Sequence, residues 1–216
     1  MSPKSFIVNA LTFLRVPLIF AWLGFAIAAE LNFSSACAVV ACALMLASGL
    51  TDLYDGRLAR RWGVVSAFGK MADPLMDKVF YVVAFPGLLW LIMRQGESDA
   101  HAMMMLWFTI LYFLRDMWVT FLRSVGSGYG ADVAAMWLGK FRTALSFPTA
   151  GWVYFYLAFH TASDCFCECG EGVFARAWLV SCFVVEAVML GVNAVSFITY
   201  TKAYWPYLER AVKNER

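Results

Sequence analysis

Four aspartates in one short segment are the residues of this 216-residue chain whose types and spacing could do chemistry. The segment reads DLYDGRLARRWGVVSAFGKMADPLMDK and begins at Asp52. Asp52 and Asp55 are three residues apart, so on a helix they share one face. Asp73 and Asp77 are four residues apart and share a face in the same way. The glycines and polar residues between the pairs allow a turn, which would set two helices antiparallel with four carboxylates opposite one another.

The four aspartates need positive charge beside them, because carboxylates close together repel one another. An all-oxygen ligand set with no His or Cys nearby favours hard divalent ions such as Mg²⁺, Mn²⁺ or Ca²⁺ over zinc or copper. Carboxylates on facing helices hold paired metal ions in helical bundles, and such ions suit phosphoryl transfer because they clamp phosphate oxygens. The alternative is a set of helix-end aspartates paired with nearby cations, namely Arg57, Arg60, Arg61, Lys70 and Lys78.

The elements that must position these aspartates are membrane helices, because the chain is too apolar for a soluble domain. Hydrophobic residues make up 62% of it and charged residues 15%, against about 45–50% and about 25% in soluble domains. Six apolar runs are separated by charge: Val16–Ala29, Ser35–Leu50, Val79–Met93, Met103–Leu114, Leu145–Phe159 and Val173–Ile198. Several are shorter than the ~20 residues that cross a bilayer, so we expect their helices to extend into polar sequence. The sequence predicts an all-α polytopic membrane protein, with six transmembrane helices in a single domain over residues 1–216.

The segment before the first run, Ser5–Arg15, has apolar residues at helical spacing, with Asn9, Thr12 and Arg15 between them. This pattern predicts an N-terminal helix that lies in the membrane interface. A plain extension of the first transmembrane helix is the alternative.

The positive residues gather on one side of the membrane in a six-helix topology. All but Arg94 and Arg176 of the 17 Lys and Arg residues lie on the same side as both termini. The positive-inside rule therefore predicts that both termini and the aspartate segment face the cytoplasm, in the cell (inner) membrane. The net charge of only +2 argues against nucleic acid as a partner.

The aspartate segment resembles the signature of the CDP-alcohol phosphatidyltransferase family. Eight positions over 26 residues match the signature without a gap: Asp52-x2-Asp55-Gly56-x2-Ala59-Arg60-x8-Gly69-x3-Asp73-x3-Asp77. The resemblance implies six transmembrane helices, usually in a homodimer, and a cytoplasm-facing site with two divalent ions, Mg²⁺ or Mn²⁺. The reaction it implies displaces CMP from a CDP-linked lipid by an alcohol hydroxyl.

The same resemblance implies roles for individual residues. It makes all four aspartates metal ligands, and it gives Asp77 the further role of the general base that takes the alcohol proton. The residues that it places around the cytidine diphosphate are Gly56, Ala59, Arg60, Ser66 and Gly69.

Three further stretches bear on the acceptor alcohol. They are NALTFLR at Asn9–Arg15, RDMWVTFLR at Arg115–Arg123 and GKFRT at Gly139–Thr143. Together with DPLMDK at 73–78, they resemble the phosphatidylglycerophosphate synthase branch of the family. That branch moves the phosphatidyl group of CDP-diacylglycerol to sn-glycerol 3-phosphate and releases CMP. The nearest alternative is a cardiolipin synthase of the same family, which uses phosphatidylglycerol as acceptor.

Cations at the cytoplasmic ends of the fourth and fifth spans support a phosphorylated acceptor. They are Arg115, Arg123, Lys140 and Arg142. Arg could hold a phosphate through paired N–H donors, and Lys could do so as a point charge. Anchoring to anionic lipid headgroups is the alternative role for these residues.

A divalent-cation transporter is an alternative of a different class, with the four aspartates as its ion site. It predicts carboxylates near mid-membrane with access from both sides. These four are instead expected toward the cytoplasmic ends of their helices, and the outer halves of the spans hold almost no polar residues. The sequence therefore favours the transferase.

Some polar residues lie outside these motifs. Glu186 falls within the last apolar run, and we expect it to hydrogen-bond a neighbouring helix or to lie at a dimer interface. The cluster Cys165, Cys167 and Cys169 falls in an outer loop, where a disulfide or free thiols are expected. The other cysteines are expected to pack as small apolar residues. The sequence assigns no role to His101.

Overall fold

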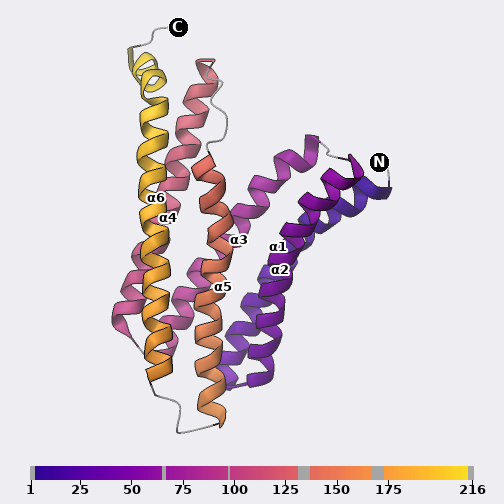
Figure 1. The fold of residues 1–216 in the computed structure, drawn as a ribbon, viewed down its shortest axis with the longest axis vertical. Helices are drawn as coiled ribbons and strands as arrows, with labels where there is room; N and C mark the ends of the chain where they lie inside the picture. Colours follow the sequence, from indigo (N-terminus) through magenta and orange to yellow (C-terminus); the bar gives the residue numbers. More distant parts are fainter. Residues whose placement is uncertain (1–2, 65–66, 97, 131–136, 167–172, 214–216) are drawn as a thin grey trace.

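The computed structural model describes residues 3–64, 67–96, 98–130, 137–166 and 173–213, and this part of the chain contains six α-helices and no strand. In order they are α1 (Pro3–Asn32), α2 (Ser35–Trp62), α3 (Ala67–Gln95), α4 (Asp99–Gly128), α5 (Trp137–Phe166) and α6 (Val173–Lys213). The helices run up and down, so that both chain termini lie toward the same end of the bundle (Figure 1). We call this end the terminal end. The end of α2, the start of α3, the end of α4 and the start of α5 also lie there.

Within the described residues, five helices are long and apolar enough to cross a membrane, which confirms an all-α multi-pass protein. The five segments are Phe6–Asn32, Ser35–Trp62, Leu75–Gln95, Asp99–Gly128 and Ala175–Lys213. The remaining helix, α5, has 30 residues, which is more than the ~20 that cross a bilayer. Its tyrosines, hydroxyl residues and Arg142 lower its hydropathy. Because α5 packs against α2, α3 and α6, its position supports the prediction of a sixth span.

The N-terminal segment and the first apolar run form one continuous helix, α1. Residues 5–15 are therefore the first part of this helix rather than a separate interfacial helix, which matches the alternative interpretation of the sequence. Figure 1 shows these first turns leaning away from α6. Pro17 lies inside α1, and a proline removes a backbone hydrogen bond and bends a helix. The first turns thus have a different tilt without a break in the helix.

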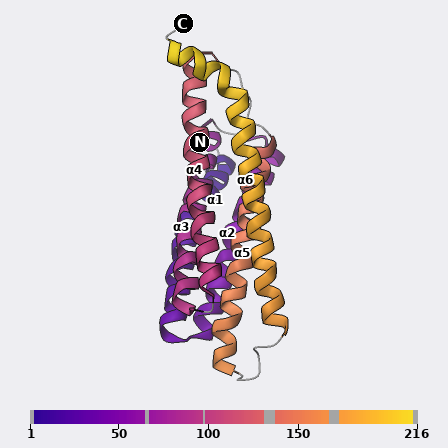
Figure 2. The same cartoon turned by 90° about the vertical axis from the view of Figure 1, so that its left-hand side faces the viewer.

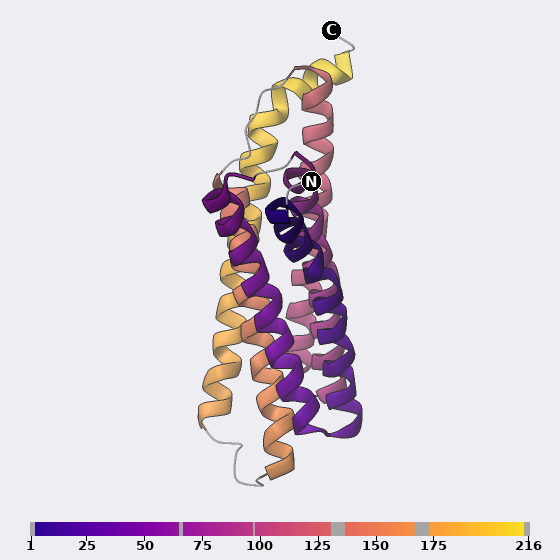
Figure 3. The same ribbon diagram turned by 90° about the vertical axis from the view of Figure 1, so that its right-hand side faces the viewer.

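Two helix pairs frame the bundle. α1 and α2 are joined by a short turn and pack against each other (Figure 3). α4 and α6 also pack against each other, and their C-terminal parts extend beyond the other helices at the terminal end (Figure 2). α3 and α5 lie between these pairs, since α3 contacts α1, α4 and α5, and α5 contacts α2 and α6.

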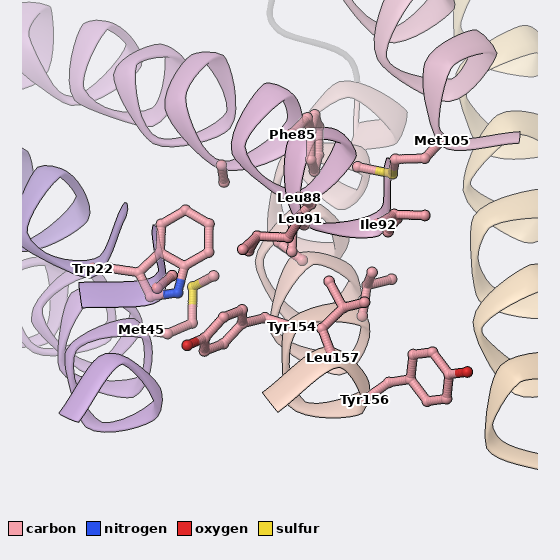
Figure 4. Close-up of a cluster of buried hydrophobic side chains, with 14 of the residues drawn as sticks. Trp22, Met45, Phe85, Leu88, Leu91, Ile92, Met105, Tyr154, Tyr156 and Leu157 are labelled. Atoms are coloured by element: carbon pink, nitrogen blue, oxygen red, sulfur yellow. The ribbon is translucent and has the colours of Figure 1, made fainter. Parts of the chain in front are cut away.

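The main hydrophobic core contains buried residues from all six helices and is rich in aromatic rings (Figure 4). The rings of Trp22 and Tyr154 meet edge to face with centroids 5.2 Å apart. Phe85 makes the same kind of contact with Phe108 and Tyr112, at 4.9 Å each. Such edge-to-face pairs add specific geometry to apolar burial. This core therefore fixes how the six helices pack against one another.

Gly49, three residues before Asp52 on α2, allows α2 and α5 to approach closely. A Cβ at this position would overlap the ring of Phe147. We expect Gly49→Ala to lower the free energy of unfolding by about 1–3 kcal/mol, the usual cost of overpacking, and hence to lower the midpoint of thermal unfolding in detergent. Gly24→Ala is the matched control, because nothing lies within 4 Å of a Cβ there. Equal midpoints for the two variants would contradict this close packing.

Candidate active site

The two aspartate pairs lie on α2 and α3, toward the terminal end of the bundle. Asp52 and Asp55 belong to α2, and Asp73 and Asp77 belong to α3. Among the described residues, α2 and α3 do not pack directly against each other, and each packs against α1 and α5 instead. The expected direct contact between these two helices is therefore not formed there. The side chains of the first three aspartates lie outside the described part of the structure, so the meeting of four carboxylates stays a prediction.

A cavity of about 430 Å³ lies at the terminal end, and all six helices contribute to its wall. Ser48 of α2 and Asp77 of α3 line it, so it borders both helices that carry the aspartates. Its charged lining residues are Arg15, Asp77, Lys78, Arg115, Asp116, Arg123 and Arg142. Because cations outnumber carboxylates in this wall, the cavity suits an anionic ligand.

Asp77 forms an ion pair with Arg15 of α1. Arg15 Nη1 donates to Asp77 Oδ1 over 2.6 Å. The side chain of Arg15 is only 4% exposed, whereas that of Asp77 is 32% exposed. The carboxylate of Asp77 is thus held from one side by a buried guanidinium and remains accessible from the cavity. The sequence did not place Arg15 in the site, although it ends one of the stretches that carry the family resemblance.

The chemistry of the donor set fits a divalent metal ion. Asp77 presents carboxylate oxygens to the cavity, and the other predicted ligands are also aspartates on the same ends of α2 and α3. Carboxylate oxygens are the ligands that Mg²⁺ and Mn²⁺ prefer. No cluster of three or more His, Cys, Asp or Glu side chains occurs in the part of the chain that the structure describes, where Asp77 is the one predicted ligand with a described side chain.

Asp116 of α4 joins cations from three helices. Lys78 Nζ of α3 lies 3.0 Å from Asp116 Oδ2. Arg142 Nη2 of α5 donates to Asp116 Oδ1, also over 3.0 Å. The neighbouring Arg115 lies at 3.9 Å, and the hydroxyl of Tyr81 hydrogen-bonds the same carboxylate. Asp116 therefore draws together three of the cations that line the cavity, although the sequence did not single it out.

Arg142 is fixed by contacts on several sides. Its guanidinium carbon lies 4.0 Å from the ring centroid of Tyr112, a cation–π distance. Arg142 Nη1 donates to Asn193 Oδ1 over 3.3 Å, and Asn193 in turn donates to the carbonyl of Leu111 over 3.0 Å. Arg142 is only 2% exposed. These contacts hold its guanidinium in the wall of the cavity. Lys140 lies on the same helix, but its side chain is outside the described part.

Arg115 and Arg123 of α4 both approach Tyr200 of α6. The guanidinium carbons lie 5.0 Å and 5.3 Å from the centroid of its ring. Arg123 Nη2 also donates to the Tyr200 hydroxyl over 3.0 Å, and Arg115 Nη2 donates to the hydroxyl of Ser196. The structure thus brings three of the predicted phosphate-binding residues to one cavity. Tyr200 was not expected from the sequence.

The structure describes only some of the residues that are predicted to line the cytidine diphosphate site. Gly56 and Arg60 lie on α2, where Arg60 is exposed and its Nη2 is 3.8 Å from a Cβ position at Gly56. Gly69 lies on α3. The side chain of Ala59 and the whole of Ser66 are outside the described residues. Neither Gly56 nor Arg60 is among the described residues that line the cavity, so their role stays a prediction.

Glu186 and His101 form a buried pair between α6 and α4. Glu186 Oε1 lies 3.1 Å from His101 Nε2, and both side chains are almost wholly shielded from solvent. This contact is the hydrogen bond to a neighbouring helix that was one of the two expectations for Glu186. The sequence missed His101 as the partner because the two residues are 85 positions apart. Neither residue lines the cavity.

Three of the six cysteines have side chains that the structure describes. Cys37 and Cys42 are half-buried, Cys182 is buried, and all three are free thiols. Each lies in or against the main hydrophobic core, which confirms that they pack as small apolar residues. The expected loop cluster cannot be placed, since Cys167 and Cys169 and the side chain of Cys165 lie outside the described residues.

The family follows from comparison with known proteins. The sequence model of the CDP-alcohol phosphatidyltransferase family matches residues 6–192. The chain therefore belongs to the CDP-alcohol phosphatidyltransferase family. Members of this family use divalent metal ions, in agreement with the donor chemistry of the aspartate motif.

Individual relatives are similar over part or most of the chain. A protein of Mycobacterium tuberculosis named "Probable phosphatidylglycerophosphate synthase" is 34% identical over 137 residues, which are 63% of this chain and 60% of that protein. A CDP-diacylglycerol–glycerol-3-phosphate 3-phosphatidyltransferase of Treponema pallidum is 31% identical over 185 residues, or 86% and 79% of the two chains. A cardiolipin synthase (CMP-forming) of Streptomyces coelicolor is 28% identical over 116 residues, covering 49% of each chain. The match thus spans about 60% of the length of the mycobacterial relative.

Proposed function

We propose that this protein transfers the phosphatidyl group of CDP-diacylglycerol to sn-glycerol 3-phosphate, giving phosphatidylglycerophosphate and CMP. The observation that carries the proposal is the shared cavity at the terminal end. There, the carboxylate of Asp77 lies in the same wall as the guanidinium groups of Arg115, Arg123 and Arg142. A group that can take a proton and groups that can bind a phosphate are thus available to one ligand. The names of the relatives from Mycobacterium tuberculosis and Treponema pallidum support this acceptor.

In this proposal the aspartates serve the nucleotide-linked lipid. Asp52, Asp55, Asp73 and Asp77 would hold two divalent ions, Mg²⁺ or Mn²⁺, which offset the charge of the diphosphate and of the departing CMP. Gly56, Ala59, Arg60, Ser66 and Gly69 would line the cytidine diphosphate site, as the family resemblance implies. The small residues among them leave room for the ligand beside the helix backbone.

Asp77 would act on the acceptor. It takes the proton of the attacking hydroxyl while the hydroxyl oxygen forms a bond to the phosphatidyl phosphorus. The bond from that phosphorus to the CMP oxygen breaks, and CMP leaves with that oxygen. Arg15 keeps the carboxylate in place during this step, because its buried guanidinium donates to one oxygen of a carboxylate that lines the cavity. Positioned proton transfer of this kind contributes about 10²–10⁴ to a rate.

The arginines would bind the phosphate of the acceptor. Arg115, Arg123 and Arg142 offer N–H donors that match phosphate oxygens, and Lys140 would add charge. Arg142 is held by Asp116, Asn193 and Tyr112, so little side-chain entropy is lost on binding. This arrangement favours a soluble alcohol that carries its own phosphate.

A panel of acceptors tests the proposed reaction. Purified protein in detergent with CDP-diacylglycerol and Mg²⁺ or Mn²⁺ should release CMP on addition of sn-glycerol 3-phosphate, and a chelator should abolish the release. Glycerol, which lacks the phosphate, is the matched control and should support at least about 100-fold less turnover, since a buried charge-assisted site is then left unpaired. The lipid product is identified by mass spectrometry.

Two outcomes of the panel would contradict the proposal. If phosphatidylglycerol outcompetes glycerol 3-phosphate and cardiolipin forms, the protein is a cardiolipin synthase, as the Streptomyces coelicolor relative is named. If no CMP appears with any acceptor and liposomes containing the protein take up Mn²⁺, it is a divalent-cation transporter.

We also propose a topology and an assembly. The terminal end would face the cytoplasm, because it carries nearly all of the Lys and Arg residues, and the protein would lie in the cell (inner) membrane. The family resemblance supports a homodimer, and the hydrophobic core that all six helices share supports a single domain over residues 1–216.

A further inference from the structure

Tyr200 lies at the point where α6 meets the two arginines of α4. The residue is 1% exposed and lines the cavity. It belongs to a small hydrophobic cluster that also contains Tyr204 of α6 and two aliphatic residues of α4. The rings of Tyr200 and Tyr204 stack, with centroids 6.4 Å apart. Tyr200 is thus held by packing on its own helix and against α4.

This placement brings together two side chains that start far apart. Arg115 and Arg123 are eight residues apart on α4, which separates their Cα atoms by about 12 Å along the helix axis. Their guanidinium carbons nevertheless lie 5.0 Å and 5.3 Å from the same Tyr200 ring centroid. Arg side chains have many rotamers, and a fixed partner is needed to hold two of them at one site. The ring supplies cation–π contact to both guanidinium groups.

The hydroxyl of Tyr200 adds a second, directional contact. It accepts a hydrogen bond of 3.0 Å from Arg123 Nη2. The hydroxyl of Ser196, one helical turn earlier on α6, accepts a hydrogen bond from Arg115 Nη2. One face of α6 therefore orients both arginines, and both of them line the cavity.

Gly139 of α5 makes room for this hydroxyl. A Cβ at Gly139 would lie 2.6 Å from the Tyr200 hydroxyl oxygen, 3.4 Å from Cζ and 3.5 Å from Cε2. The first distance is a clash, whereas the other two are ordinary contacts. The absence of a side chain at Gly139 is therefore matched to the hydroxyl of Tyr200 and not to its ring.

We propose that Tyr200 is a positioning residue that sets the spacing of Arg115 and Arg123 for the acceptor phosphate, and that Gly139 admits its hydroxyl. The inference rests on the proposed function, because it takes this pair of arginines as the acceptor-phosphate site. It adds a role for α6, which carries none of the residues predicted from the sequence for substrate binding.

The test measures steady-state kinetics of the full-length protein in detergent, with each substrate varied in turn. Tyr200→Phe keeps the ring but loses the hydrogen bond to Arg123, and should raise KM for glycerol 3-phosphate about tenfold. KM for CDP-diacylglycerol and kcat should change less than about twofold. Gly139→Ala should raise the acceptor KM at least as much, because its methyl group displaces the hydroxyl.

The double variant separates positioning from a general loss of structure. In Tyr200→Phe/Gly139→Ala the clashing oxygen is gone, so the acceptor KM should return to the value of Tyr200→Phe alone. Tyr207→Phe is the matched control, since Tyr207 is on the same helix with Arg210 6.0 Å from its ring centroid and is not among the described residues that line the cavity. It should leave both KM values unchanged.

The outcomes distinguish failure of the inference from failure of the proposed function. If Arg123→Ala raises the acceptor KM but Tyr200→Phe does not, the proposed acceptor site stands and the role of Tyr200 is wrong. If Arg115→Ala and Arg123→Ala also leave that KM unchanged, the proposed acceptor site itself is wrong. If the two Tyr200 and Gly139 defects add in the double variant, or if both KM values rise together with a lower thermal midpoint, Tyr200 is structural only.

Discussion

Asp77→Asn should reduce turnover by at least about 10³-fold, because the change removes both the proton acceptor of the proposed reaction and one of the four carboxylates of the metal motif. The substituted amide still accepts a hydrogen bond from Arg15, whose donor contact with Asp77 is 2.6 Å long. The fold is therefore expected to persist. The rate is measured as CMP released per mole of protein with saturating CDP-diacylglycerol and glycerol 3-phosphate.

Asp99→Asn is the matched control for this change of acid to amide. Asp99 is exposed and lies in the first turn of α4, at the opposite end of the bundle, so its substitution should leave turnover unchanged. The thermal midpoint of each variant in detergent shows whether the bundle is intact. Full turnover in Asp77→Asn would remove Asp77 as the general base, whatever the behaviour of the control.

Much of the fold could be predicted from the sequence, because a membrane helix needs a long apolar run whatever its neighbours are. The helix ends differ from the ends of the apolar runs where polar residues continue a helix. The last apolar run ends at Ile198, for example, whereas α6 continues to Lys213. The added turns hold Tyr200 and Tyr204, which pack against α4. An apolar run marks only the part of a helix that lies in lipid, whereas backbone hydrogen bonding and helix packing can continue the helix beyond it.

Which face of each helix is buried could not be predicted from hydropathy. In a soluble bundle the apolar side faces the core, but in a membrane the outward side is apolar as well. On α6 the apolar residues Val180, Val184 and Val188 are exposed, whereas Glu186 and Ser196 are wholly buried. Which helices pack together therefore cannot be predicted from the sequence of one segment. The same holds for the partners of buried polar residues.

The candidate site shows the same division. The sequence predicted that Asp77 lies on the first part of a helix, because it comes just before the third apolar run, and α3 confirms this position. Its partner Arg15 is 62 residues away, and Tyr200 is 77 residues from Arg123. Contacts of this length depend on how α1 and α6 pack, which a motif within one segment does not encode. Asp116 stands in a stretch that carries the family resemblance, and that stretch was the one available signal for it.

Arg142→Met should weaken both the fold and acceptor binding, because the buried guanidinium of Arg142 joins α5 to α4 and α6. The change keeps a long apolar side chain but removes the donors to Asp116 and Asn193. Loss of one partner from a buried ion pair costs on the order of 3 kcal/mol, so the thermal midpoint in detergent should fall. Arg94→Met is the matched control, since Arg94 is exposed at the other end of α3.

The kinetic effect of Arg142→Met can be measured apart from its effect on the fold, at temperatures where the variant is still folded. Loss of a charge-assisted hydrogen bond to phosphate should raise KM for glycerol 3-phosphate about 10–100-fold at temperatures well below the midpoint, with KM for CDP-diacylglycerol little changed. Arg142→Lys keeps the charge but cannot reach Asp116 and Asn193 together, so its acceptor KM should be intermediate.

Combining Arg142→Met with Asp116→Asn should cost less stability than the sum of the two single changes, because the second change removes the carboxylate that the first change leaves with fewer partners. Strict additivity would mean that Arg142 and Asp116 are not coupled, and the cations of the cavity would then be held independently of that carboxylate.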